Sequence, residues 1–332
     1  MLRLDAIRHQ DIDRLAPLWI ALHKHHRKVA PQLAPFVPDD TSWASRKRQY
    51  TELLAGEWFG FIASDDDRDI GYLLCGKRPM TWNATFAVPA SLWELVTIFV
   101  DERYRGQGVG SRLLTAMDEV VVRSDIRTKL IGVIPDNRSA VELYKARGYL
   151  PTWLMLTRFQ RPAPAQRAGG PVAVEAIKQA AIPALEPLWL SLHHHHQAVS
   201  PHLGPFVTDE VSWPVIGELL SQSAQDGLLW IARDGERILG LASAAIYGID
   251  ALASYSDTWI TDESVGEIKF LVVAEEARGK GVGTALMDAV DRELAARDVR
   301  DQFVGAIEPN KGAIRFYESR GFRPAWLELT KF

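Results

Sequence analysis

Two short glycine-rich stretches have the residue types and the setting to bind a phosphate group. They are Arg105-Gly106-Gln107-Gly108-Val109-Gly110 and Arg278-Gly279-Lys280-Gly281-Val282-Gly283. Each follows an apolar run and precedes residues whose apolar positions recur every three or four places, which predicts a strand, a turn and a helix in that order. Glycine permits positive φ and a close backbone approach, and the first N–H groups of a helix have no partner within it. Each stretch is therefore a predicted phosphate site at a helix N-terminus.

Two common phosphate-binding motifs do not fit these stretches. A P-loop needs Gly-Lys followed by Ser or Thr, whereas Lys280 is followed by Gly281 and the first stretch has Gln107 at that position. The dinucleotide fingerprint needs a further glycine where Ser111 and Thr284 stand. A tight turn without a ligand is the remaining alternative, and its recurrence in the same context disfavours it.

The two stretches belong to a duplicated domain. The segment from Leu18 to Trp43 resembles the segment from Leu188 to Trp213 at an offset of 188 − 18 = 170, and the glycine stretches are offset by 278 − 105 = 173. A period this long indicates two copies of a domain and not a solenoid repeat. We predict domains at 1–160 and 172–332, joined by a linker at 161–171 that is rich in Pro, Ala and Gly.

Each copy has the same predicted order of elements: a strand, two helices around a proline-rich loop, a hairpin, then the strand, glycine turn and helix, a further strand, a short helix and a last strand. The strand–helix–strand units require right-handed crossovers and parallel strands. The expected fold class is α/β, with a mixed sheet and helices on both faces, formed twice. Arg46-Lys47-Arg48 is expected on a solvated helix face.

The pattern Arg-x-x-Gly-x-Gly after a strand resembles the acetyl-CoA loop of the GNAT superfamily of N-acetyltransferases. A second block of that family is also present twice, from Asn137 to Tyr144 and from Asn310 to Tyr317. The resemblance covers nearly all of both copies and implies two acyl-CoA N-acyltransferase (GNAT) domains in tandem. It implies acetyl-CoA (coenzyme A) as the cofactor, and a strand that separates from its neighbour at a bulge to admit it.

The resemblance also implies which residues hold the cofactor. The backbone N–H at the end of the strand, on Val100 or Val273, is expected to face the thioester oxygen as an oxyanion-hole donor. The complete set of expected cofactor-binding residues is Ile98, Phe99, Val100, Arg105, Gly106, Gln107, Gly108, Val109, Gly110, Asn137, Leu271, Val272, Val273, Arg278, Gly279, Lys280, Gly281, Val282, Gly283 and Asn310.

Four residues are candidates for proton transfer. An alkylamine is mostly protonated at pH 7, so a base assists its attack, and Glu94 and Glu267 lie where many family members carry the catalytic glutamate. The alternative is a carboxylate at a solvated strand end. Tyr144 and Tyr317 match the family tyrosine that protonates the leaving thiolate, or else they are core aromatics.

Some relatives place the glutamate in the following strand. Gly132 and Gly305 occupy that position here, which removes this option.

Two histidine runs recur in the copies, His23 to His26 (interrupted by Lys24) and His193 to His196. They lie late in the first helix of each copy. Three interpretations remain open: a metal site, a lining of the acceptor pocket, or hydrogen bonding at a helix end. Because zinc needs three or four converging ligands and the run faces all sides of a helix, we expect no metal.

Composition limits the partners. A net charge of −4 argues against nucleic acid, one cysteine excludes an internal disulfide, and no apolar run is long enough for a membrane span. We expect a cytoplasmic protein, either a monomer of two pseudo-equivalent domains or a homodimer.

The expected function is an acetyl-CoA-dependent N-acetyltransferase acting on a primary amine of a small molecule by direct transfer in a ternary complex. The alternative is a non-catalytic acyl-CoA-binding or scaffold protein. If one copy alone is catalytic, the second is favoured, because the bulk of Phe99 lies near the cofactor path in the first.

Overall fold

The computed structural model describes residues 2–80, 84–87, 89–160, 172–248 and 257–332. The predicted linker at 161–171 lies outside these residues. The elements of the first copy are β1 (Leu2–Ala6), α1 (Ala16–Val29), α2 (Asp39–Leu53), β2 (Trp58–Asp65), β3 (Arg68–Pro79), β4 (Ser91–Val100), α3 (Val109–Val121), β5 (Lys129–Val133), α4 (Arg138–Ala146) and β6 (Leu150–Arg158). Those of the second copy are β7 (Ala173–Ala176), α5 (Glu186–Val199), α6 (Asp209–Gln225), β8 (Leu229–Asp234), β9 (Arg237–Gly248), β10 (Ser264–Val273), α8 (Val282–Ala296), β11 (Asp301–Ile307), α9 (Lys311–Ser319) and β12 (Arg323–Lys331).

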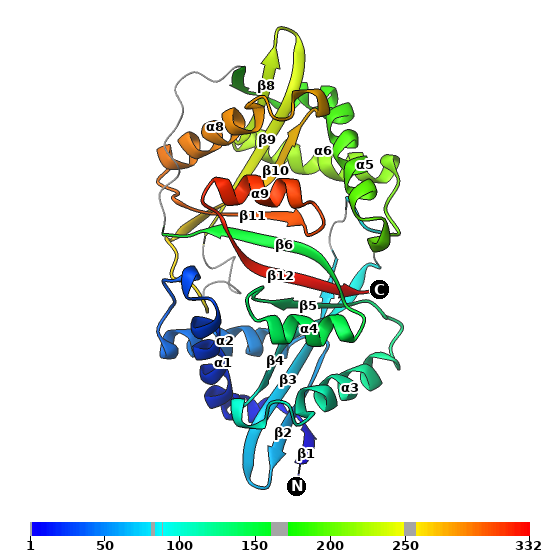
Figure 1. The fold of residues 1–332 in the computed structure, drawn as a ribbon, viewed down its shortest axis with the longest axis vertical. Helices are drawn as coiled ribbons and strands as arrows, with labels where there is room; N and C mark the ends of the chain where they lie inside the picture. The colour runs from blue at the N-terminus through cyan, green and yellow to red at the C-terminus, as the bar shows by residue number, and fades with distance from the viewer. Residues whose placement is uncertain (1, 81–83, 88, 161–171, 249–256) are drawn as a thin grey trace.

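The described strands form one continuous sheet in the order β1-β2-β3-β4-β5-β12-β6-β11-β10-β9-β8-β7 (Figure 1). The β4–β5 and β10–β11 pairs are parallel, as the crossovers require, and the other pairs are antiparallel. The mixed sheet expected from the sequence is therefore present, but as one sheet and not two. Figure 1 shows α4 and α9 in front of the central strands, and the two halves of the molecule follow one another along its long axis.

The last strand of each copy lies in the other half of the sheet. β12 pairs with β5 of the first copy, and β6 pairs with β11 of the second copy. β6 and β12 run antiparallel side by side at the centre of the molecule (Figure 1). We refer to the half built on β1–β5 as the first half and to the half built on β7–β11 as the second half. Each half is thus completed by a strand from the other copy.

Polar contacts at the far ends of the exchanged strands hold them in place. Arg158 of β6 is 1% exposed, donates to the carbonyl of Arg320 at 3.1 Å, and forms an ion pair with Asp291 of α8. Lys331 of β12 donates to the carbonyl of Arg147 at 2.8 Å, in the equivalent place of the first half. Because a buried cation needs a partner, these contacts tie each exchanged strand to the half that it enters.

The helices pack on the sheet as their apolar spacing predicts. Leu113, Leu114, Met117 and Val121 of α3 are all buried. Trp19 of α1 and Trp189 of α5 are also buried, in agreement with a packing role. None of the helices within the described ranges is long and apolar enough to cross a membrane.

Lys47 and Arg48 are exposed, as expected of a solvated helix face, but Arg46 is not, so the expectation was wrong for Arg46. It is 7% exposed, lies 2.5 Å from the buried carboxylate of Asp257, and its guanidinium stacks over the Trp19 ring at 4.1 Å. Asp257 precedes β10, so a loop of the second copy is held by α2 of the first. A partner distant in sequence buries Arg46, and the local pattern of three basic residues could not reveal it.

The same exchange of loops occurs in both directions. Ser42 of α2 donates to the carbonyl of Asp257 at 2.6 Å, and Ser212 of α6 donates to the carbonyl of Ala84 at 2.7 Å. Short bridges join Phe36 to Trp259 and Phe86 to Phe206. The loop before β4 and the loop before β10 are therefore each anchored by the first two helices of the other copy.

Candidate active site

The two glycine loops have the conformation that the residue types predict. Gly106 and Gly108 have φ of +74° and +81°, and Gly279 and Gly281 have φ of +74° and +85°. Gly108 and Gly281 are the N-cap residues of α3 and α8. A Cβ at Gly106, Gly108 or Gly279 would have no other atom within 4 Å, so backbone conformation and not crowding requires glycine there.

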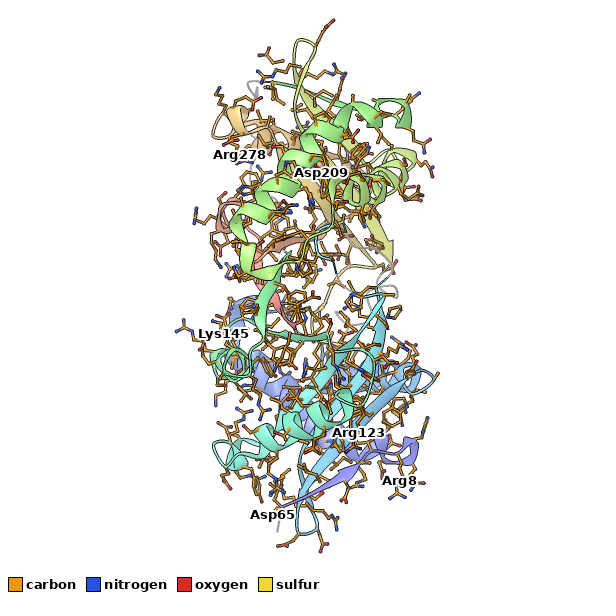
Figure 2. All side chains as sticks on the ribbon, turned by 90° about the vertical axis from the view of Figure 1, so that its right-hand side faces the viewer. Arg8, Asp65, Arg123, Lys145, Asp209 and Arg278 are labelled. Carbon is orange, nitrogen blue, oxygen red and sulfur yellow. The ribbon has the colours of Figure 1, made fainter. Side chains whose placement is uncertain are left out.

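The loops present free backbone donors to solvent. In the described structure, the N–H groups from Gly106 to Ser111 have no hydrogen-bond acceptor, and the same is true of Gly279, Gly281, Val282 and Gly283. The glycines at 106, 108, 279 and 281 are exposed. Figure 2 shows Arg278 of the second loop in the half opposite to Arg123, which follows α3, so the two donor clusters are far apart. Each loop could hold a diphosphate independently of the other.

Each loop follows a strand that separates from its parallel neighbour. β4 pairs with β5 only from Trp93 to Leu95, although β4 continues to Val100. β10 pairs with β11 only from Val265 to Ile268, although β10 continues to Val273. The register of each strand against its antiparallel neighbour shifts at the same place, between Leu95 and Thr97 and between Ile268 and Phe270. The expected bulge and the expected separation of strands are therefore present in both halves.

The strand ends direct free N–H groups into this separation. Asp101 donates its N–H to Ile70 of β3, and Ala274 donates its N–H to Leu239 of β9. Because successive N–H groups of a strand point to opposite sides, those of Val100 and Val273 point away from β3 and β9, toward the side where pairing has ended. This orientation suits a donor to an oxygen atom placed between the strands.

The glycines at 132 and 305 are required by the exchanged strands. A Cβ at Gly132 would lie 2.0 Å from the indole nitrogen of Trp326, and a Cβ at Gly305 would lie 2.3 Å from that of Trp153. Trp326 is on β12 and Trp153 on β6, so each tryptophan comes from the other copy. No larger side chain, and so no glutamate, fits at these two positions.

The candidate bases have different surroundings. Glu267 accepts a hydrogen bond from the Tyr247 hydroxyl at 2.9 Å and forms an ion pair with Lys269 at 3.2 Å. Burial and the neighbouring Glu267 raise the pKa of Tyr247. Burial opposes the charge of Lys269, but Glu267 and Tyr247 outweigh it and raise the pKa of Lys269. Glu267 therefore lies in a hydrogen-bonded network whose cation stays charged at neutral pH.

Glu94 has a simpler environment. Its carboxylate lies 3.7 Å from the Arg78 guanidinium, and both side chains are at least one-third exposed. Val96 stands where the second half has Lys269, and Arg78 stands close to the position of Tyr247. The two halves thus share the glutamate but differ in its partners, which are Arg78 for Glu94 and Tyr247 with Lys269 for Glu267.

A third glutamate lies in the first half and was missed by sequence reasoning. Glu328 of β12 is directly opposite Gly132 of β5, and burial raises its pKa to about 7, with Glu94 raising it further and Arg78 lowering it. The contacts that Tyr247 and Lys269 make with Glu267 were also not predicted, although the sequence contains a local sign of them: Lys269 is a charged residue within an apolar strand. Glu328 had none, because only the strand exchange brings it to Glu94.

Tyr144 and Tyr317 are 4% and 5% exposed, on α4 and α9. Burial raises the pKa of both phenols, so each remains protonated at neutral pH and able to donate. Tyr144 packs edge-on against Tyr149, and Tyr317 against Phe322. Both the core role and the donor role that the sequence allowed are compatible with this position.

Asn137 and Asn310 are the N-cap residues of α4 and α9. The Asn310 side chain accepts the N–H of Ala313 at 3.2 Å, as capping predicts. Asn137 instead accepts from the Ser139 hydroxyl at 3.1 Å and bonds to His25. Both asparagines therefore have a structural partner, whether or not they also touch a cofactor.

His23 and His193, one from each histidine run, bond to backbone carbonyls in the same way. The Nε2 atom of His23 bonds the Val37 carbonyl at 2.9 Å, and that of His193 bonds the Val207 carbonyl at 3.0 Å. Burial lowers the pKa of His26 and His196 to about 3, so both are neutral at physiological pH. No cluster of potential metal ligands occurs within the described ranges.

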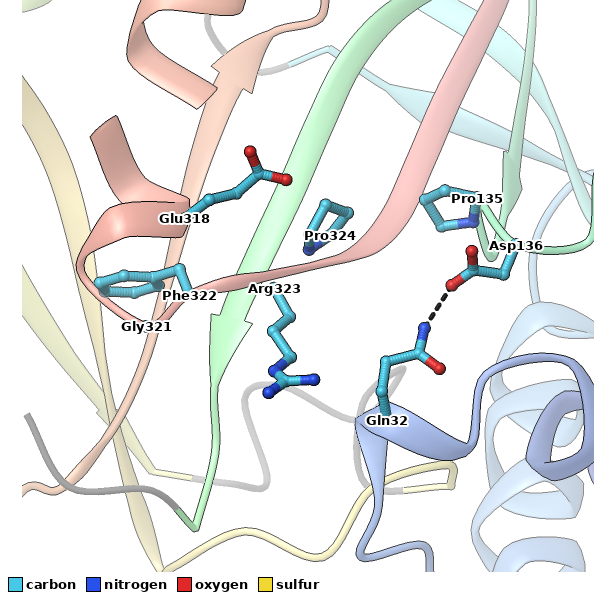
Figure 3. A pocket seen from close by; sticks show the side chains of 8 residues that line it. All are labelled: Gln32, Pro135, Asp136, Glu318, Gly321, Phe322, Arg323 and Pro324. Carbon is cyan, nitrogen blue, oxygen red and sulfur yellow. Dashed lines mark hydrogen bonds between the residues drawn. The ribbon is translucent and has the colours of Figure 1, made fainter. Parts of the chain in front are cut away.

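A hollow of about 680 Å³ is lined by residues of both copies (Figure 3). It is lined by Gln32, Pro135, Asp136, Glu318, Gly321, Phe322, Arg323 and Pro324. Gln32 donates to Asp136 across one side of it. It contains no loop glycine and none of the candidate glutamates or tyrosines, so its chemistry is separate from that of the two candidate sites.

The fold and the loops define the class of protein. The chain belongs to the acetyltransferase (GNAT) family, whose model matches residues 19–149 and 189–322, one region in each copy. The protein is thus an acyltransferase with two GNAT regions in tandem, as the sequence predicted. Membership of this family supports the use of an acyl-CoA donor.

More particular similarities are to named acetyltransferases. The chain is 26% identical to a mycothiol acetyltransferase of Acidothermus cellulolyticus over 318 residues, 90% of each chain. It is 24% identical to that of Geodermatophilus obscurus over 225 residues, 66% of this chain and 67% of the relative. A crystal structure of a GCN5-related N-acetyltransferase from Sphaerobacter thermophilus has the same fold, with a TM-score of 0.56, 17% identity and coverage of 99% of this chain and 95% of that one.

Proposed function

We propose that the protein is an acetyl-CoA-dependent N-acetyltransferase that acetylates a primary amine of a small molecule by direct transfer in a ternary complex. The observation that carries the proposal is the repeated unit of a separated strand pair and an exposed loop with unpartnered N–H groups. The acetyltransferase relatives support the same chemistry.

The residues that would hold the cofactor are those of the loops and strand ends. The N–H groups of 106–111, of Gly279 and of 281–283 are proposed to bind the diphosphate. The side chain of Arg105, which also donates to the Val100 carbonyl at 3.2 Å, lies beside the first loop. The N–H groups of Val100 and Val273 are proposed to bind the carbonyl oxygen. When bound, acetyl-CoA would supply an acetyl group activated as a thioester.

The proposed proton transfers use groups already in place. Glu267 would accept the proton of the acceptor ammonium, directly or through water, while Lys269 and Tyr247 hold its carboxylate. Glu94 would have the same position in the first half. Tyr144 and Tyr317, which stay protonated, would each donate a proton to the departing sulfur.

A count of binding sites tests the cofactor assignment. Calorimetric titration with acetyl-CoA should give two sites per chain, and Gly108→Val or Gly281→Val should remove one site each, because valine does not tolerate a φ near +80°. Gly217→Ala is the matched control, since a Cβ there meets no atom within 4 Å and α6 lies away from the loops. Two sites retained in both loop variants would exclude these loops as the diphosphate sites.

An assay of free thiol across a panel of primary amines tests turnover. Thiol release that requires an amine would establish the transfer. Stoichiometric binding of acetyl-CoA with no release from any amine would instead support a non-catalytic acyl-CoA-binding protein.

A further inference from the structure

Glu328 of β12 lies in the first half, beside β5, and takes no part in the proton transfers described above. Gly132, directly opposite Glu328, is the first residue of β5 beyond Ile131, the last one paired with β4. Glu328 therefore lies across β5 from the point where β4 and β5 separate. Its strand, β12, belongs to the second copy, so the chain brings this carboxyl to the first half only through the strand exchange.

Glu328 and Glu94 project from the same face of the sheet. Directly opposed residues of neighbouring strands share a face, so Glu328 lies with Gly132, and Glu94 lies with Leu130, two residues earlier on β5. The side chains of Leu327 and Leu329 enter the core on the opposite face. The two carboxyl groups thus lie on one face of the sheet, one on β4 and one on β12, with β5 between them.

The Glu328 carboxyl has no hydrogen-bond partner in the part of the chain that the structure describes, although the side chain is half-buried. The charged groups that face it are Arg78 of β3 and Glu94 of β4. Burial of a carboxyl without a donor favours its neutral form, and the pKa of about 7 follows from that cause first. At neutral pH the group exchanges its proton readily, as a general base must.

The second half provides a natural comparison. Met155 of β6 is opposite Gly305 of β11, at the place equivalent to Glu328. Of the two positions that Glu94 and Glu328 occupy in the first half, only one carries a carboxylate in the second half. It is Glu267, which is hydrogen-bonded to Lys269 and Tyr247. In the first half Glu94 has Arg78 as its cation, and a second carboxyl without a hydrogen-bond donor, Glu328, lies on the same face two strands away. The two halves therefore differ in net charge around the separation, and the first half is the more acidic.

We propose that Glu328, in place of Glu94, is the general base of the first half, so that this acceptor site is built from both copies. The inference rests on the proposed N-acetyltransferase function. The Glu328 carboxylate takes one proton from the acceptor ammonium, the amine nitrogen forms the bond to the acetyl carbon, and the carbon–sulfur bond breaks. The second proton of the nitrogen goes to the sulfur, with Tyr144 as the donor in relay, and Glu328 releases its proton to water. With two carboxyl groups present, the acceptor expected there is one that carries a second positive charge.

The experiment isolates each half of the full-length chain. Gly281→Val leaves only the first loop intact, and Gly108→Val leaves only the second. Thiol release with diamines and monoamines is then measured from pH 5.5 to 9 in each background, with and without Glu328→Gln. In the Gly281→Val background, Glu328→Gln should lower the rate by about tenfold or more and remove an inflection near pH 7, while acetyl-CoA affinity stays the same. Glu328→Asp should restore part of the rate.

The Gly108→Val background is the control for damage to the fold. There, Glu328→Gln should leave the rate of the second half unchanged. The inference is overturned if Glu328→Gln keeps the rate and the inflection in the first half, if it lowers both halves equally, or if the first half has no turnover while the second has. Absence of thiol release in the unaltered protein with every amine would instead overturn the proposed function itself, and this inference with it.

Discussion

Replacement of Arg46 by isoleucine tests whether the loop before β10 is held by charge. The guanidinium is 2.5 Å from Asp257, whose side chain has no exposed surface. Without Arg46, the carboxylate keeps only neutral donors, Gln49 at 3.1 Å and Thr258 at 2.7 Å. Removing one partner of a buried ion pair destabilises a protein by about 3–5 kcal/mol, because the remaining charge is uncompensated. We expect a loss of that size in the free energy of unfolding.

The loss should depend on pH in a defined direction. Burial raises the pKa of Asp257, and Arg46 opposes that rise. In Arg46→Ile the folded pKa rises further above the unfolded value, so the folded state binds the proton more tightly. The stabilising contribution of protonation is complete below the unfolded pKa of about 3.9 and is lost as pH rises through the folded pKa. The variant should therefore be least destabilised near pH 4.5 and most destabilised near pH 8.

The second half supplies the control. Ile216 occupies the position equivalent to Arg46 (46 + 170 = 216), and Ser212 binds the carbonyl of Ala84 as Ser42 binds that of Asp257. The double variant Arg46→Ile/Asp257→Ala should therefore recover most of the stability that Arg46→Ile loses. Part of the loss, up to about 2 kcal/mol, remains because the guanidinium no longer stacks on Trp19.

These free energies of unfolding are measured by urea denaturation at pH 4.5 and pH 8. The proteins compared are the wild type, Arg46→Ile, Asp257→Ala and the double variant. A change below about 1 kcal/mol for Arg46→Ile at pH 8, or a double variant no more stable than Arg46→Ile, would refute the reasoning.

Three further predictions concern single positions. Glu328→Gln should raise the free energy of unfolding at pH 8 by at most about 3 kcal/mol and leave it unchanged at pH 4. The pKa of this carboxyl is about 7 in the folded protein against 4.5 ordinarily, so the group stabilises the fold only while it is protonated. Equal effects at both pH values would contradict this. Gly132→Ala should lower the free energy of unfolding by about 1–3 kcal/mol, because the alanine Cβ would lie 2.0 Å from the Trp326 indole nitrogen. An unchanged free energy of unfolding would mean that the indole moves freely. Tyr317→Phe should reduce thiol release by the second half about tenfold or more without weakening acetyl-CoA binding, and Tyr144→Phe should leave that half unaffected.

The sequence was most informative where function depends on local backbone geometry. The glycines at 106, 108, 279 and 281 have positive φ because no other residue adopts it so readily, and the period of the following residues sets the buried face of α3 and α8. Both signals lie within about ten residues of each other. The parallel pairs β4–β5 and β10–β11 could likewise be predicted from the strand–helix–strand units.

Features that depend on distant pairing could not be predicted. β6 and β12 have equivalent sequences, so apolar alternation alone is satisfied equally well in either half of the sheet. The exchange then determines the burial of Arg158, the glycine at 132 and the placement of Glu328 beside Glu94. Arg46 was misassigned for the same reason, since Asp257 lies more than two hundred residues away.

The exchange of last strands ties the chemistry of one copy to its covalent attachment to the other. If residues 1–160 were produced alone, β6 could take the vacant place beside β5, because it is the counterpart of β12. Such a fragment would retain its glycine loop and Glu94, but Met155 would stand where Glu328 now lies. The exchange thus makes the two halves chemically unequal, because β12 brings a carboxyl group to the first half and β6 brings a thioether to the same place in the second.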